Sequence, residues 1–206
     1  MPLLALLEQL QLEILEGKSI PWEVLYILLL WLSLVTLVPF SLITNDISGS
    51  PAKRIEALAQ FFLSRPGKER DAASVVLGRL YPRRDILEPL LSDFLHWARS
   101  RMQVTSSSFE VCQSFTQATG ILQTLCAIAK NSDTTFALNY ISELESLLEL
   151  YVPWENKSML VDRFRTKLAG RLALQLLLND PGDERVDGLV DTLLTSLGHK
   201  VCRRIY

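Results

Sequence analysis

The sequence is short of the residue types on which metal sites, catalytic centres and covalent frameworks depend. Its 206 residues include three Cys, two His and nine Gly. Three widely spaced cysteines are too few for a disulfide framework and are typical of a reducing compartment. Neither CxxC nor HxxxH spacing occurs, and there is no glycine-rich phosphate loop. The sequence therefore predicts no metal site, no bound cofactor and no catalytic residues.

An excess of positive charge is also missing. The chain has 21 Lys and Arg against 23 Asp and Glu, which gives a formal net charge of −2. This balance disfavours nucleic-acid binding, because phosphate backbones select proteins with a basic footprint. Disorder is excluded as well, since 49% of the residues are hydrophobic and such a chain collapses around a core.

What the sequence has in abundance is apolar surface, with a mean hydropathy of +0.20. The segment from Val24 to Asn45 carries no charge and is long enough to span a bilayer. Ser33, Thr36 and Pro39 interrupt it, however, and leave a strongly apolar core from Val24 to Val38. That shorter length favours a helix buried on all sides inside a protein over a membrane span.

Apolar residues recur at helical spacing along the whole chain, and no alternating run predicts a strand. We expect Gly17 to end the first helix and Pro39 to end the second, while Ser50 caps the third. The expected helices cover residues 3–14, 21–39, 55–63, 68–80, 87–102, 115–129, 138–151, 160–176 and 186–197.

Short loops between these helices predict antiparallel pairs with a period of about 40 residues, as in HEAT and armadillo repeats. Residues 1–206 are thus expected to form one HEAT-type solenoid segment of about four helix pairs and a flanking helix, part of a longer solenoid. Small residues in the fourth helix, Ala72, Ala73 and Gly78, would let two helix backbones approach closely. A globular helical bundle is the alternative.

Charged clusters around the fourth helix are the remaining candidates for function. Lys68, Arg83 and Arg84 could meet an acidic protein surface, and for Arg83 and Arg84 solvated side chains are an equally good interpretation. For Arg70 and Asp71 we favour ion pairs that tie neighbouring repeats together.

Several blocks resemble the tubulin-folding cofactor D family, also called tubulin-specific chaperone D. Trp22, the run Tyr26–Ser33 and Val38–Phe40 are similar to its W…Y-x-L-L-L-W-L-S…I-P-F segment. Further blocks follow in the family's order over most of the chain: Gly67–Ala73, Leu90–Trp97, Gly120–Lys130 and Asn156–Leu174. The chain departs from the family at Arg84, where the family has R-P-D, and in its much shorter length.

The resemblance implies a cytoplasmic, cytoskeleton-associated chaperone that handles the αβ-tubulin heterodimer. Such proteins bind β-tubulin, assemble with cofactor E and an Arf-like small GTPase, and recruit cofactor C to promote GTP hydrolysis by tubulin. This chain would correspond to a section of their N-terminal half, with a scaffolding role and no enzymatic activity of its own. The partner-binding candidates remain Lys68, Arg83 and Arg84.

Two other interpretations stay open. A generic HEAT-repeat adapter would have the same helices but no preference for tubulin. A membrane protein would use residues 24–45 as its span, which the resemblance does not suggest.

Overall fold

A computed structural model describes residues 1–43, 49–102, 108–150 and 159–204, which form nine α-helices and contain no strand. The prediction of an all-α fold is confirmed. The helices are α1 (Pro2–Leu15), α2 (Trp22–Val35), α3 (Pro51–Leu63), α4 (Lys68–Leu80), α5 (Leu87–Met102), α6 (Ser108–Asn131), α7 (Thr135–Leu150), α8 (Met159–Asn179) and α9 (Arg185–Arg204).

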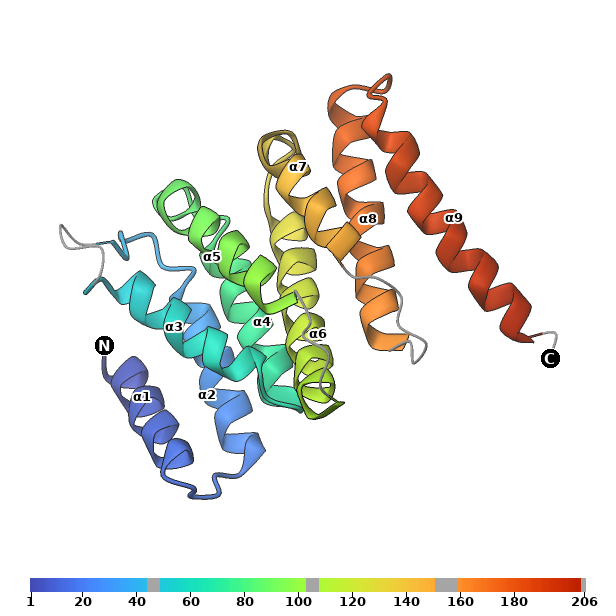
Figure 1. Cartoon of the computed structure of the whole chain (residues 1–206). Coiled ribbons are helices and arrows are strands. Elements are labelled where there is room, and N and C mark those ends of the chain that lie inside the picture. The colour runs from blue at the N-terminus through green and yellow to red at the C-terminus, as the bar shows by residue number, and fades with distance from the viewer. Residues whose placement is uncertain (44–48, 103–107, 151–158, 205–206) are drawn as a thin grey trace.

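The helices stack in two layers (Figure 1). In one layer α2 packs on α4, α4 on α6 and α6 on α8. In the other layer α3 covers α4, α5 covers α6 and α7 covers α8, while α9 lies against α8. Each helix therefore contacts chiefly its neighbours in the stack, as in a HEAT or armadillo solenoid, and this predicted architecture is confirmed.

One apolar core runs the length of the stack. It begins at Leu4 of α1, continues through Phe62, Leu77 and Leu125, and reaches Leu189 of α9. Because no helix buries its apolar stripe alone, each one depends on the next for removal of that stripe from water.

The ends of the early helices follow local sequence signals. Gly17, directly after α1, has a φ of +86°, which a residue with a Cβ rarely adopts. The Oγ of Ser50 accepts a hydrogen bond from the backbone N–H of Lys53 at 3.3 Å, and Pro51 occupies the first helical position. Both predicted helix boundaries are confirmed.

Small residues bring α4 and α6 into close contact. A Cβ added at Gly78 would overlap the Cβ of Ala127, and one added at Gly120 would lie 2.8 Å from the carbonyl oxygen of Leu63. The side-chain amide of Asn131 uses this proximity to donate a hydrogen bond to the Gly78 carbonyl at 2.7 Å. The predicted role of Gly78 in close helix packing is confirmed.

The prediction for Arg70 and Asp71 is wrong. The two side chains pair with each other at 3.2 Å within α4, and among the described residues neither forms an ion pair with another repeat. Arg70 instead lies against α6 through its aliphatic stem. Its Cγ is so close to Gly120 that a Cβ added there would lie 3.2 Å from it. Adjacent positions on one helix turn explain the pairing.

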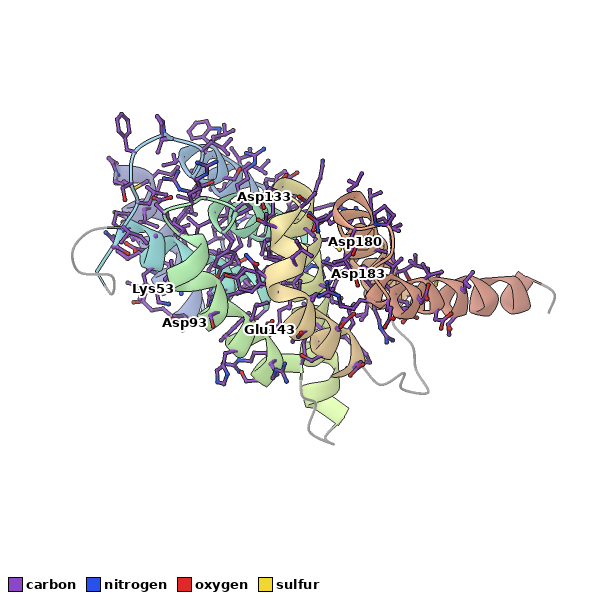
Figure 2. The ribbon with its side chains drawn as sticks, turned by 90° about the horizontal axis from the view of Figure 1, so that it is seen from above. Lys53, Asp93, Asp133, Glu143, Asp180 and Asp183 are labelled. Atoms are coloured by element: carbon purple, nitrogen blue, oxygen red, sulfur yellow. The ribbon has the colours of Figure 1, made fainter. Side chains whose placement is uncertain are left out.

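A polar network, buried at Tyr81 and Glu56 and exposed at Asp93, joins α3 to the end of α4 and to α5. Tyr81 is fully buried and donates a hydrogen bond to Glu56 at 2.6 Å. Lys53 bridges Glu56 at 2.9 Å and Asp93 at 3.1 Å, on the side of the molecule formed by the odd-numbered helices (Figure 2). Burial first and the Glu56 charge second raise the pKa of Tyr81 well above its ordinary value, so the phenol keeps its proton.

The apolar segment of α2 is not buried on all sides, so that prediction is wrong. Trp31 and Leu34 are 58% and 57% exposed, whereas Leu25, Leu29 and Leu32 face the core. The second helix has α4 on one side and α1 on another, which leaves its outer face uncovered. Across the described ranges, none of the helices has both the length and the hydropathy that a bilayer crossing requires.

The close approach of α4 and α6 predicts opposite effects of adding a methyl group at two helical glycines. Gly78→Ala should lower the free energy of unfolding by about 1–2 kcal/mol, because the new Cβ forces the helices apart. Gly188→Ala is the matched control, since no atom lies within 4 Å of a Cβ there, and it should raise stability by about 0.5–1 kcal/mol. Urea unfolding followed by circular dichroism measures both, and equal effects would contradict the packing.

Candidate partner-binding surface

Exposed apolar side chains form a ridge along α2 and the segment that follows it. We call this set the apolar ridge; its members are 43–75% exposed, and they are Val24, Ile27, Trp31, Leu34, Leu37 and Phe40. In α2 they recur three or four residues apart and so share one face. Contiguous apolar patches on a protein surface are typical of sites that contact another protein.

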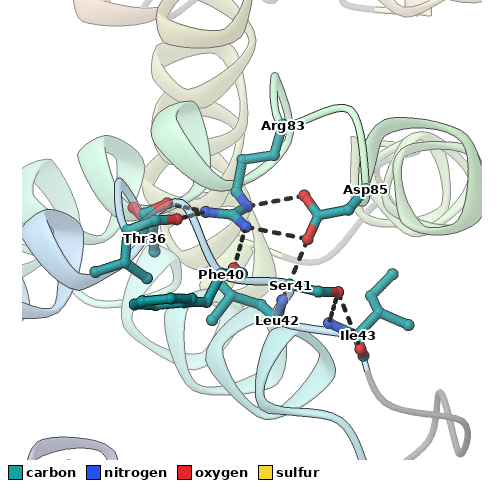
Figure 3. Close-up of polar contacts among 8 residues, drawn as sticks. Thr36, Phe40, Ser41, Leu42, Ile43, Arg83 and Asp85 are labelled. Atoms are coloured by element: carbon teal, nitrogen blue, oxygen red, sulfur yellow. Dashed lines mark hydrogen bonds and ion pairs between the residues drawn. The ribbon is translucent and has the colours of Figure 1, made fainter.

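The second helix ends at Val35, four residues before the predicted stop at Pro39. The side chain of Arg83, in the loop after α4, supplies the reason. Its guanidinium donates hydrogen bonds to the carbonyl oxygens of Thr36 at 2.7 Å, Val38 at 2.6 Å and Phe40 at 2.7 Å (Figure 3). Thr36 is the C-cap residue of α2, and a cation beside its carbonyl complements the helix dipole.

Asp85 completes this arrangement, which we call the Arg83 clamp. Its carboxylate accepts two hydrogen bonds from Arg83, both at 3.0 Å, and a third from the backbone N–H of Leu42 at 3.2 Å (Figure 3). Burial alone would raise the pKa of Asp85, but the hydrogen bonds from Arg83 and Leu42 outweigh it and lower the pKa below its ordinary value. The carboxylate is thus held in its charged form.

The clamp fixes how the ridge continues beyond α2. Because three carbonyls of the segment turn inward to one guanidinium, the backbone between Thr36 and Leu42 is held against the loop after α4. Leu37 and Phe40 project into solvent from that fixed backbone, 58% and 75% exposed. The hydrogen bonds of the clamp thus keep these two side chains exposed.

The three predicted partner-binding residues occupy different environments. Arg83 is 14% exposed and directs its guanidinium into the clamp. Arg84, the next residue, is exposed to solvent. Lys68 is 65% exposed at the start of α4 and lies 3.6 Å from Asp71. The structure thus places Arg83 and Arg84 in one loop and Lys68 at the opposite end of α4, and partner binding by these residues stays a prediction.

A hollow of about 170 Å³ lies between α5 and α7, with His96, Arg99 and Glu143 on its wall. Clefts that bind small molecules usually measure roughly 300–1,000 Å³ and are lined mainly by apolar groups. Arg99 is moreover engaged by the hydroxyl of Ser146 on α7. This hollow suits helix packing better than a substrate.

The comparisons with known proteins agree with this architecture. Residues 1–102 match the family described as tubulin-specific chaperone D-like, ARM repeat. These residues contain the apolar ridge, the Arg83 clamp and all three predicted partner-binding residues, and we call them the chaperone D-like half.

A curated relative is the tubulin-folding cofactor D of Schizosaccharomyces pombe, 39% identical to this chain over 85 residues. The matched stretch covers 41% of this chain and 8% of the relative, so the chain spans a small part of that protein's length. No solved structure matches the chain.

Sequence reasoning placed Arg83 among the candidates but missed its role in the chaperone D-like half. An Arg and an Asp two residues apart, directly after a helix, were a signal for a loop ion pair. The carbonyls that Arg83 binds lie 43–47 residues earlier in the chain, and nothing local connects them.

The clamp predicts a large difference between two adjacent arginines. Arg83→Ala should lower the free energy of unfolding by about 2–3 kcal/mol, since it leaves three carbonyls and a carboxylate without their charged donor. Arg84→Ala changes an exposed side chain and should stay within about 0.5 kcal/mol of the parent. Urea unfolding measures both variants, and a similar loss for the two would show that the clamp contributes no stability.

The lowered pKa of Asp85 predicts a pH-dependent contribution. Its stabilisation is fully present above the unfolded-state pKa, near 3.8, and is lost as the pH falls through the lower folded-state pKa. Asp85→Asn removes the titrating group, so the stability gap between the parent and this variant should be wide at about pH 6 and narrow at about pH 3. Urea midpoints at the two pH values measure the gap; one of constant width would contradict a charged Asp85 in the clamp.

Proposed function

We propose that this chain is a scaffold segment of a tubulin-folding chaperone, and that it binds β-tubulin or the αβ-tubulin heterodimer. The match of residues 1–102 to the chaperone D-like ARM-repeat family carries this proposal. The name of the relative, tubulin-folding cofactor D, supplies the client. Stacked helix pairs also suit the task, because solenoids present extended surfaces to folded proteins.

The wider role that we propose follows the family resemblance. The chain acts in assembly and disassembly of the heterodimer together with cofactors C and E and an Arf-like small GTPase, in the cytoplasm and at the cytoskeleton. It contributes to GTP hydrolysis as a scaffold, since the nucleotide belongs to tubulin and a catalytic arginine can come from another subunit. It needs no catalytic residue of its own for that role.

We also propose that residues 1–206 are one HEAT-type segment of a longer solenoid. The much greater length of the matched relative supports this. Leu194, 58% exposed on α9, is the kind of side chain that a further helix pair would cover.

The apolar ridge is the contact surface that we propose for tubulin. Its side chains are large, and the Arg83 clamp fixes Leu37 and Phe40, so binding does not require the segment to be ordered first. Arg84 is exposed in the loop that holds the clamp, and it adds a charged contact at the edge of the ridge. Lys68 adds a second charged contact at the start of α4. Arg83 does not contact the partner and instead holds the backbone of the ridge in place.

The ridge predicts a specific loss of tubulin binding. The double variant Leu37→Ser and Phe40→Ser should weaken binding of purified αβ-tubulin by about tenfold, because apolar side chains at the centre of an interface carry most of its affinity. Both residues are more than half exposed, so the fold should persist. Biolayer interferometry with the immobilised full chain measures the dissociation constant.

The matched control replaces Leu12 and Leu15 of α1 by Ser, since these are 60% and 65% exposed but lie outside the ridge. It should change affinity less than about twofold. An equal loss in both double variants would overturn the ridge as the contact surface. Failure of the parent chain to bind tubulin above a control protein of similar negative charge would instead favour a generic HEAT-repeat adapter.

A further inference from the structure

The layer of even-numbered helices has one side that no other helix covers. The opposite side of the layer packs against α3, α5 and α7. Within the layer, each even-numbered helix packs against the next. The side chains on the uncovered side can be assigned from the neighbours that each helix contacts. We make this assignment for α6 and α8.

The partners of α8 account for three of its faces. Arg171 and Gln175 donate hydrogen bonds to backbone carbonyls of α6, and Gly170 faces Leu193 of α9. The core face carries Leu168 and Leu172. On the remaining face are exposed side chains at positions i, i+4, i+11 and i+15, namely Arg163, Lys167, Leu174 and Leu178. Gly170, at i+7, lies at the edge of this face, where the face meets α9.

The same reasoning places one cation of α6 on this side. Asn131 and Ala127 face α4, whereas Cys126 and Ala129 face α8. Lys130 lies between these two directions and is exposed. It therefore shares the uncovered side with the cations of α8.

The charge of Lys167 acts on a residue of α6. Burial raises the pKa of the Cys126 thiol to about 11, and the positive charges of Arg171 and Lys167 oppose that rise. A charge acts on a buried thiol in this way only when it lies nearby. Lys167 is therefore close to Cys126 of α6.

Within the described part of the chain, the cations on the uncovered side of α6 and α8 lack acidic partners. Among the residues that the structure describes, no carboxylate forms an ion pair with Lys130, Arg163 or Lys167. The side formed by the odd-numbered helices carries both signs of charge, since Lys53 pairs with Asp93 there and Glu143 lies on the same side (Figure 2). On the side of α6 and α8, by contrast, the three cations have no acidic partner among the described residues.

We propose that this basic face, made of Lys130, Arg163 and Lys167 with Leu174 and Leu178, binds an acidic segment of a partner protein. Charge complementarity selects the acidic residues, and the leucines further along α8 select apolar ones next to them. Nucleic acid fits less well, because it rewards a long stripe of cations without leucines and a positive net charge. The proposal concerns α6 and α8 and does not depend on the tubulin contact at the apolar ridge.

Fluorescence anisotropy with a designed probe tests the basic face on the full chain. The probe is a short labelled peptide with glutamates in its first half and leucines in its second, and the reference probe has lysines in place of the glutamates. The parent should bind the acidic probe in a salt-sensitive manner and the basic probe far more weakly. The double variant Arg163→Glu and Lys167→Glu should weaken acidic-probe binding by about tenfold, since like charges then face each other.

The matched control is Lys18→Glu with Arg101→Glu, which changes the net charge equally at two exposed cations outside this face. It should weaken binding less than about twofold, and circular dichroism checks that both double variants keep their helices. Three results would each overturn the proposal: no binding of the acidic probe, equal losses in the two double variants, or tighter binding of a DNA duplex than of the acidic probe.

Discussion

Close contact between the even-numbered helices is the constraint on which the rest of the structure depends. At Gly78 there is no room for a Cβ beside Ala127, and a Cβ at Gly120 would lie 3.2 Å from the side chain of Arg70 on α4. These contacts let α4 and α6 pack with their backbones close together, and the odd-numbered helices then cover one side of the resulting layer. The other side, the loops and the two ends of the stack remain for contacts with other molecules.

The Arg83 clamp shows how a solenoid of this kind fixes an irregular segment. The guanidinium binds the carbonyl of Thr36, directly after α2, and two carbonyls further along the segment, and Asp85 holds the guanidinium in turn. Leu37 and Phe40 are thereby kept exposed on a fixed backbone. In our proposal this ridge contacts tubulin, and the basic face of α6 and α8 holds an acidic segment on the other part of the molecule.

Much of the fold could be predicted from the sequence, because helical periodicity and the positions of Gly17, Ser50 and Gly78 are local signals. The exposure of Trp31 could not, since α2 is apolar on nearly every side and its sequence does not say which sides have neighbours. The hydrogen bond between Tyr81 and Glu56 and the contacts of Arg83 join residues 25 to 47 positions apart. Such pairings depend on how the helices stack, which periodicity does not determine.

Hydrogen exchange with mass spectrometry, on the full chain with and without purified αβ-tubulin, tests the central claim most directly. The account predicts slower exchange of backbone amides across α2 and residues 36–43 when tubulin is bound, because the apolar ridge and the segment held by Arg83 become covered. The account would be contradicted if saturating tubulin slowed exchange in other parts of the chain while α2 and residues 36–43 exchanged as in the free chain.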